Sequence, residues 1–187
     1  MRSRGFRDEN RELAAIAIEV GETDREAPVP HTFDTIYERE FDYVWNTLGR
    51  LGTPSADLPD RVHDVFVVIH RRWGELDPGR PIRPWLFGIA RRIAAGARRK
   101  RRETAYEHEA AAPADDSLAA RDLLWRALAK LDDARREVVV LKELDGFTGA
   151  EIAEILGIPV NTVHSRLRLG RADLVAALAA LQEHRGR

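Results

Sequence analysis

Apolar residues recur at helical spacing along almost the whole chain, and no stretch shows a convincing alternation of apolar and polar residues. One apolar stripe runs from residue 33 to residue 48, and a second runs from residue 62 to residue 73. The stripes consist of Phe33, Ile36, Tyr37, Phe41, Val44, Trp45 and Leu48, and of Val62, Val65, Phe66, Ile69 and Trp73. Because strands need period two and helices a period near 3.6, this pattern predicts an all-α fold.

Helix-start signals indicate where three of these helices begin. Thr32 or Asp34 can cap the helix that carries the first stripe. Pro84 stands where a proline at the first helical position is expected, before a helix that continues into a run of arginines. Asp132 or Asp133 can cap a helix in the C-terminal part of the chain.

The length of 187 residues allows one domain or two small ones. Residues 103–117 contain five alanines and one proline but no apolar stripe long enough to pack, which is typical of a linker. We therefore predict two small helical domains, residues 31–102 and 118–182, joined by an acidic flexible linker. Residues 1–30 form an N-terminal extension whose role stays open, with one short amphipathic segment from Leu13 to Val20.

Composition excludes several classes of protein. The chain has no cysteine, so it has neither disulfides nor a thiol nucleophile, and no window approaches 18 uninterrupted apolar residues. The N-terminus is charged and lacks the apolar core of a signal peptide, which predicts a cytoplasmic protein. No histidine has a partner at metal-binding spacing, and neither a nucleophile elbow nor a glycine-rich phosphate loop occurs. We expect no metal, no cofactor, no small-molecule substrate and no enzymatic activity.

Charge is segregated, although the net charge is only -1. Residues 80–102 contain nine basic residues and no acidic one, whereas residues 103–116 contain five acidic residues and no Lys or Arg. On a helical wheel with Leu86 at zero, four residues of the basic block lie within about 60° and would face a core. They are Ile89, Ala90, Ile93 and Ala97, and the opposite side carries Arg91, Arg92, Arg98, Arg99 and Arg102.

An exposed face that holds only arginines repels itself unless an anion compensates the charge, so it predicts nucleic-acid binding. The alternative is a merely solvated charged face. Trp85 and Phe87 lie at the flanks of this helix, where each ring can either pack under the preceding loop or meet an unstacked base. For Trp85 we favour core packing.

The C-terminal part has the pattern of a helix-turn-helix. Thr148 and Glu151 have capping-box spacing, and Gly157 makes the turn before a second helix that starts after Pro159. With Val163 at zero on that helix, the inward face lies within about 40° of it. Inward residues are Leu167, Gly170 and Leu174, and outward ones are Asn161, His164, Ser165 and Arg168, with Arg166 and Arg171 at the sides. These outward side chains can contact base edges or phosphates. A generic three-helix corner is the alternative.

Two sets of residues resemble one family. Residues 60–66, 77–81 and 85–92 resemble region 2 of the extracytoplasmic function sigma factors of bacterial RNA polymerase. Residues 121–178 resemble region 4 of that family, and Gly157 to Leu167 is very similar to its recognition helix. The resemblance covers about residues 31–180 and is specific because both regions occur in this order.

The resemblance implies an alternative sigma factor that binds core RNA polymerase and directs promoter-specific initiation. Residues 77–102 would read and melt the minus-10 element as single strands, and helix 160–172 would read the double-stranded minus-35 element. The implied polymerase-binding residues are Asp60, His63 and Asp64. The minus-10 residues are Arg80, Arg83, Trp85, Arg91, Arg92, Arg98 and Arg99, and the minus-35 residues are Asn161, Thr162, His164, Ser165, Arg166, Arg168 and Arg171. Members of the family are commonly held inactive by an anti-sigma protein, which the resemblance implies as a further partner.

The chain departs from the family pattern at several positions. Arg61 and His63 stand where Leu and Gln are usual in the polymerase-binding helix. Arg92 and Gly96 replace a usual Asn and Asp in the basic helix, and Leu169 stands where an Arg is common. The minus-10 preference is therefore not carried over from the family.

Two other functions compete with this interpretation. The first is a DNA-binding regulator that uses only the C-terminal helix-turn-helix, with residues 31–102 as a sensing or dimerisation domain. The second is a nucleic-acid-processing enzyme, or an adaptor that uses the basic helix on RNA. Affinity capture of core RNA polymerase separates all three functions.

Overall fold

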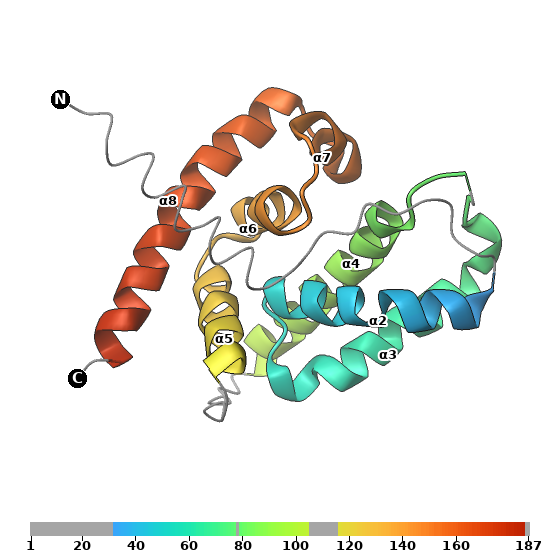
Figure 1. Ribbon diagram of the computed structural model, residues 1–187, viewed down its shortest axis with the longest axis horizontal. Coiled ribbons are helices and arrows are strands. Elements are labelled where there is room, and N and C mark those ends of the chain that lie inside the picture. Colours follow the sequence, from blue (N-terminus) through green and yellow to red (C-terminus); the bar gives the residue numbers. More distant parts are fainter. Residues whose placement is uncertain (1–31, 78, 105–115, 186–187) are drawn as a thin grey trace. The chain divides into compact units, whose positions relative to one another are not determined.

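The computed structural model describes residues 32–77, 79–104 and 116–185, and these fall into two compact units (Figure 1). Unit one contains helices α2 to α4 and unit two contains helices α5 to α8. All regular structure in the described residues is helical, with no strand among them, which confirms the all-α prediction. No helix in these ranges is long and apolar enough to cross a membrane.

Unit one is a bundle of three helices, α2 (Phe33–Arg50), α3 (Leu58–Arg71) and α4 (Ile82–Thr104), each packed against the other two. Short 3-10 turns, η1 (Ser55–Asp57) and η2 (Trp73–Glu75), lie before and after α3. Thr32, rather than Asp34, caps α2, because its Oγ1 accepts a hydrogen bond from the Thr35 N–H at 3.3 Å. The core of the unit contains Ile36, Val44 and Leu48 of α2, Val65 and Ile69 of α3, and Leu86, Phe87 and Ala94 of α4.

The apolar stripes of α2 and α3 meet in an aromatic cluster. The ring of Phe66 on α3 lies 4.6 Å from that of Tyr37 and 6.3 Å from those of Phe33 and Phe41 on α2. Ring centroids between about 4.5 and 7 Å are typical of aromatic pairs that add stability beyond burial. The two predicted stripes therefore face each other.

Helix α4 begins at Ile82, so the prediction that Pro84 occupies the first helical position is wrong. Pro84 is the third residue of the helix. The first four N–H groups of a helix have no partner within it, so a proline is tolerated anywhere in the first turn. Burial selects the earlier start, because Ile82 is 5% exposed and packs into the core.

Unit two contains α5 (Asp116–Ala129), α6 (Asp133–Val139), α7 (Gly149–Leu156) and α8 (Val160–Arg185). A π-type turn, η3 (Val140–Leu144), follows α6 directly. Asp132, rather than Asp133, caps α6 by accepting from the Ala134 N–H at 3.0 Å. Helix α8 packs on α5, α6 and α7 and thereby holds the unit together.

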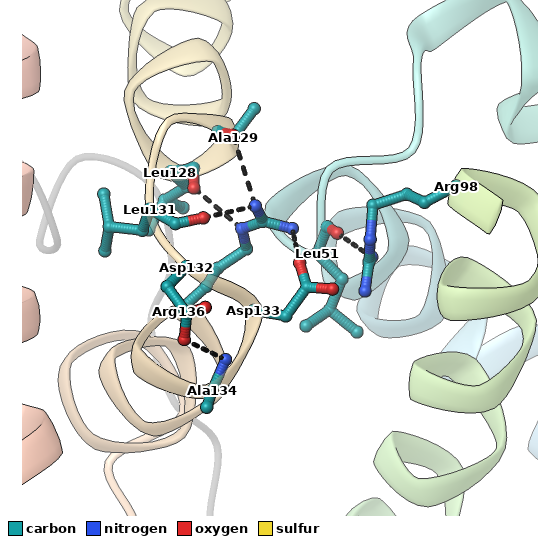
Figure 2. A network of polar contacts seen from close by, with 9 residues as sticks. All are labelled: Leu51, Arg98, Leu128, Ala129, Leu131, Asp132, Asp133, Ala134 and Arg136. Carbon is teal, nitrogen blue, oxygen red and sulfur yellow. Dashed lines mark hydrogen bonds and ion pairs between the residues drawn. The ribbon is translucent and has the colours of Figure 1, made fainter. Parts of the chain in front are cut away.

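A buried arginine joins α5 to α6 (Figure 2). Arg136 is 4% exposed and donates hydrogen bonds to the carbonyl oxygens of Leu128 at 2.7 Å, Ala129 at 3.2 Å and Leu131 at 2.7 Å. Its Nη1 also lies 3.0 Å from Oδ1 of Asp133. The guanidinium therefore donates to carbonyl groups at the C-terminal end of α5 and just after it, where a cation also complements the helix dipole.

The contact between α6 and α8 requires a glycine. A Cβ atom at Gly170 would lie 2.7 Å from Cγ2 of Val139 and 3.3 Å from the Arg135 carbonyl oxygen. Both Val139 and Gly170 are buried. A larger residue at position 170 would push the two helices apart.

The predicted linker, residues 103–117, lies for the most part outside the described residues. Helix α4 extends to Thr104 and α5 begins at Asp116, so only the two ends of that segment are described, and both are helical. The predicted N-terminal extension, residues 1–30, also lies outside the described ranges.

Candidate nucleic-acid interface

Both ends of α7, the first helix of the helix-turn-helix, have the predicted local geometry. Thr148 Oγ1 accepts from the Glu151 N–H at 3.3 Å, and Glu151 Oε2 accepts from the Thr148 N–H at 2.6 Å, which completes the capping box of α7. Gly157 ends α7 with φ 65° and ψ 39°, a left-handed conformation that favours glycine. Both predictions are confirmed.

The two faces of α8 are also confirmed. Val163, Leu167, Gly170 and Leu174 are buried. The exposed residues of the outer face are Asn161, His164, Ser165 and Arg168. Within this face Ser165 Oγ donates to the carbonyl oxygen of Asn161 at 2.7 Å, so the serine hydroxyl already has an acceptor on its own helix. Asn161, His164 and Arg168 thus carry the polar groups that point to solvent.

Arg171 has a different environment from the exposed arginine Arg168. Its Nε and Nη2 lie 2.9 and 2.6 Å from Oε1 of Glu143 on η3, and both side chains are half-buried. Thr162 and Arg166 are half-buried as well. The predicted minus-35 residues therefore form an exposed centre on α8 and a flank that includes an arginine bound within the protein.

A second ion pair fixes α8 to α6. Arg135 Nη1 lies 2.6 Å from Oδ2 of Asp173. This hydrogen bond raises the pKa of the Arg135 guanidinium above its ordinary value, and the charge of Asp173 acts in the same direction. Together with the Glu143–Arg171 pair it ties the middle of α8 to the segment before α7.

Two exposed apolar side chains on α8 are missed by the sequence prediction, which considers only polar groups for DNA reading. Val160, the first residue of the helix, is 40% exposed, and Leu169 is 36% exposed. Apolar side chains contact the thymine methyl group in the major groove. The signal in the sequence is an apolar residue placed on the outward side of a helix whose inward stripe is already complete.

The α4 arginines whose side chains the structure describes do not form one exposed face, and the side chain of Arg102 lies outside the described ones. Arg92 and Arg99 are exposed, and Arg91 is half-buried. Arg98 is half-buried too, and its Nη1 donates to the carbonyl oxygen of Leu51 at 2.5 Å (Figure 2). Leu51 caps the C-terminus of α2, where a cation complements the helix dipole. The prediction that Arg98 belongs to the exposed face is therefore wrong.

Arg83 near the start of α4 is also bound within unit one. Its Nε lies 3.1 Å from Oε2 of Glu40, a carboxylate whose side chain is 5% exposed. The guanidinium carbon lies 5.0 Å from the ring centre of Tyr43. Arg80, in contrast, is highly exposed and lies 3.3 Å from Oδ2 of Asp77 in the loop before α4.

The two aromatic residues at the start of α4 differ in burial. Phe87 is fully buried in the core of unit one, so it cannot meet an unstacked base. Trp85 is half-buried, which leaves part of its ring at the surface. Only Trp85 stays available for stacking on this helix.

On α3, Asp60 and His63 are exposed. Asp64 is half-buried and pairs with Arg61 on the same helix, with Nη1 2.5 Å from Oδ2. The polar side of α3 therefore presents one carboxylate without an ion pair in the described structure and one that is already paired. Across the described ranges no three His, Cys, Asp or Glu side chains gather as a metal site would require.

Comparisons with known proteins agree on one family. The pattern of Sigma-70 region 2 matches residues 36–104, and that of Sigma-70, region 4 matches residues 121–174. The RNA polymerase sigma factor CnrH of Cupriavidus metallidurans is 34% identical over 150 residues, which cover 71% of this chain and 78% of CnrH. The RNA polymerase sigma factor CarQ of Myxococcus xanthus is 30% identical over 158 residues, covering 80% of this chain and 91% of CarQ.

Solved structures give the same result. CnrH in complex with the cytosolic domain of CnrY matches with a TM-score of 0.60 and 30% identity over 92% of this chain and 99% of that one. The sigma factor RpoE of Bartonella quintana, solved with the anti-sigma factor NepR, shares the fold at a TM-score of 0.66 and 24% identity, over 79% and 96% of the two chains. With both sigma regions in order, the chain belongs to the extracytoplasmic function sigma factors of bacterial RNA polymerase.

Proposed function

We propose that this alternative sigma factor divides promoter recognition between its two units, with α4 at the minus-10 element and α8 at the minus-35 element. Binding to core RNA polymerase and promoter-specific initiation belong to the family as a whole. The observation that carries the division is the contrast between the exposed polar face of α8 and the exposed arginines of α4, on separate units.

At the minus-35 element, Asn161, His164 and Arg168 are the base-reading residues. They are exposed on one face of α8, opposite its buried stripe. Thr162, Ser165 and Arg166 lie beside them and contact the sugar-phosphate backbone. Arg171 supports this face from within the protein, because Glu143 holds its guanidinium.

At the minus-10 element, the exposed residues Arg80, Arg92 and Arg99 hold the melted strand by its phosphates. Trp85 offers the exposed part of its ring to an unstacked base. Three further arginines, Arg83, Arg91 and Arg98, are half-buried. They add positive potential while at least Arg83 and Arg98 serve the packing of unit one.

The polar side of α3 is the polymerase-binding surface, with Asp60 and His63 exposed. One oxygen of Asp64 already pairs with Arg61, so a polymerase cation would share this carboxylate with Arg61 or displace it. Two related sigma factors, CnrH and RpoE, were solved with partner proteins, and NepR is named an anti-sigma factor. We propose an anti-sigma partner for this chain too. We also place the chain in the cytoplasm, with its polymerase, and without an enzymatic activity of its own.

Reconstitution with core polymerase tests the proposal. The full chain should form a one-to-one holoenzyme and start run-off transcription from promoters that carry both elements. Permanganate should detect unpaired thymines near the start site. Sequence-specific DNA binding without capture of core polymerase would instead show a regulator that uses only the helix-turn-helix, and binding to RNA alone would show an adaptor.

A further inference from the structure

Gly149, the first residue of α7, leaves a space that His164 of the recognition helix fills. A Cβ atom at Gly149 would lie 3.2 Å from Nε2 and 3.7 Å from Cδ2 of His164. At Gly157, the glycine that ends α7, a Cβ would meet nothing within 4 Å, so the close approach to His164 is particular to Gly149. The Nε2–Cδ2 edge of the imidazole therefore rests against the first turn of α7.

This contact, which we call the seat of His164, determines which ring atom of His164 can face DNA. A neutral imidazole carries one donor and one acceptor nitrogen, and the two lie on different sides of the ring. With Nε2 directed at α7, Nδ1 lies on the opposite side of the ring. His164 is exposed and lies one turn from Asn161 and Arg168 on the outer face of α8. A half-turn of the ring about the Cβ–Cγ bond exchanges Nδ1 with Cδ2 and Nε2 with Cε1, so it would replace a hydrogen-bonding nitrogen by a C–H on the side of the ring that faces away from α7.

We propose that Gly149 is a specificity-determining position: its missing side chain seats His164 and thereby sets the base preference at one position of the upstream promoter element. Gly149 acts through His164 and does not itself touch DNA. The inference rests on the proposed role of α8 in reading that element.

Replacing Gly149 by Ala separates this role from folding. The close contact is with the far end of a rotatable side chain, which has to give way by a few tenths of an ångström, so we expect the ring to reorient while the helices stay in place. The capping box uses Thr148 and Glu151 and does not depend on residue 149 having no side chain. Alanine also has a higher helix propensity than glycine. The variant should therefore fold with a melting temperature at or above that of the parent.

The decisive experiment uses holoenzyme containing the full chain and a promoter library randomised across the upstream element. Gly149→Ala should change the base preference at one position by about tenfold, the size of one good base contact. His164→Ala should change the same position. The double variant should match His164→Ala alone, because Gly149 has nothing to position once the ring is gone. Additive effects, or an unchanged preference in Gly149→Ala, would overturn the proposal.

Two further measurements separate its failure from failure of the proposed function. In the free protein, NMR signals of the His164 ring should shift in Gly149→Ala but not in the control Ala150→Ser, which adds one atom to the neighbouring exposed residue. Unshifted signals would contradict the contact itself. If His164→Ala leaves the library result unchanged while Arg168→Ala still weakens selection of the upstream element, the seat has no role in specificity but α8 remains the reading helix.

Discussion

The arginines of α4 and those of α8 show how the same residue type acquires two different tasks. On α8 the helical wheel separates inward from outward residues correctly, and Arg168 remains exposed. On α4 the wheel places Arg98 outward, yet its guanidinium folds back to the end of α2. A wheel gives the direction of Cβ, whereas an arginine head group lies several bonds further along. What decides its task is whether an acceptor lies within that reach.

The largest effect is expected at Arg136 on α6, which is bound within the protein as Arg98 is but is more deeply buried. Arg136→Ala removes the donor for three carbonyl oxygens and the partner of Asp133. We expect the free energy of unfolding to fall by about 3–5 kcal/mol, because the two hydrogen bonds at 2.7 Å from a charged donor contribute about 1.5–3 kcal/mol each. Urea denaturation followed by circular dichroism measures it. The control is Arg126→Ala, an exposed arginine 3.7 Å from Asp122, which should cost less than about 1 kcal/mol. Equal losses of unfolding free energy in the two variants would show that the hydrogen bonds of Arg136 do not stabilise unit two.

A smaller loss of stability should separate Arg98 from Arg92, an exposed arginine of the same helix. Arg98→Ala removes a charged donor from the end of α2 and should lower the free energy of unfolding by about 1.5–3 kcal/mol. Arg92→Ala changes an exposed side chain and should stay within about 0.5 kcal/mol. Thermal melts of both variants measure the difference.

Strand capture should show the reverse order. Each lost phosphate contact lowers the salt slope of single-strand binding by about 0.7, so the pair Arg92→Ala and Arg99→Ala should lower it by about 1.4. The double variant should bind core polymerase normally, but its holoenzyme should open promoters poorly, as measured by permanganate reactivity. Normal opening would show that these exposed arginines do not hold the melted strand.

On α8, Arg168 and Arg171 offer the corresponding test. Arg168→Ala should weaken upstream DNA binding by about 1–3 kcal/mol, with relaxed selectivity at one position if it contacts a base. Arg171→Ala should leave the salt slope of binding unchanged and destabilise unit two, because its guanidinium is paired with Glu143. A slope reduced by about 0.9 in Arg171→Ala would place Arg171 on a phosphate instead.

The smallest effect is expected at Glu75, which pairs with Arg72 at the surface of unit one. The side-chain hydrogen bond from Arg72 lowers the pKa of Glu75 below its ordinary value of 4.5. The stability this gives is present above the unfolded-state pKa and is lost as the pH falls through the lower folded-state pKa. Glu75→Gln should therefore melt slightly earlier than the parent at neutral pH, and the two should converge in strong acid. A difference that persists there would point to packing rather than charge.

Local signals explain most of what the sequence predicts correctly. The capping box joins residues three apart, and the buried stripe of α8 repeats at the helical period, so both are visible without tertiary structure. The wrong or incomplete predictions concern side chains with distant partners. Arg98 binds Leu51 across 47 residues, Arg83 binds Glu40 across 43, and Arg171 binds Glu143 across 28.

The same limit applies to α4 and to His164. Proline fits any position of a first turn, so Pro84 alone does not locate the start of α4, which the burial of Ile82 decides. The seat of His164 depends on a missing side chain 15 positions earlier in the sequence. Sequence patterns are built from side chains that are present, so they do not reveal that the missing side chain of Gly149 makes room for His164.

The buried guanidinium of Arg136 has a consequence for how unit two opens. If α5 were to separate from α6, Arg136 would lose its hydrogen bonds to the carbonyl oxygens of Leu128 and Ala129, so this end of α5 is costlier to open than a helix end that is already exposed. The last turn of α5 and the first turn of α6 should therefore exchange their amide hydrogens at one common rate. A partner that binds α5 would then act on the whole DNA-reading unit, because separating α5 from α6 costs the hydrogen bonds of Arg136.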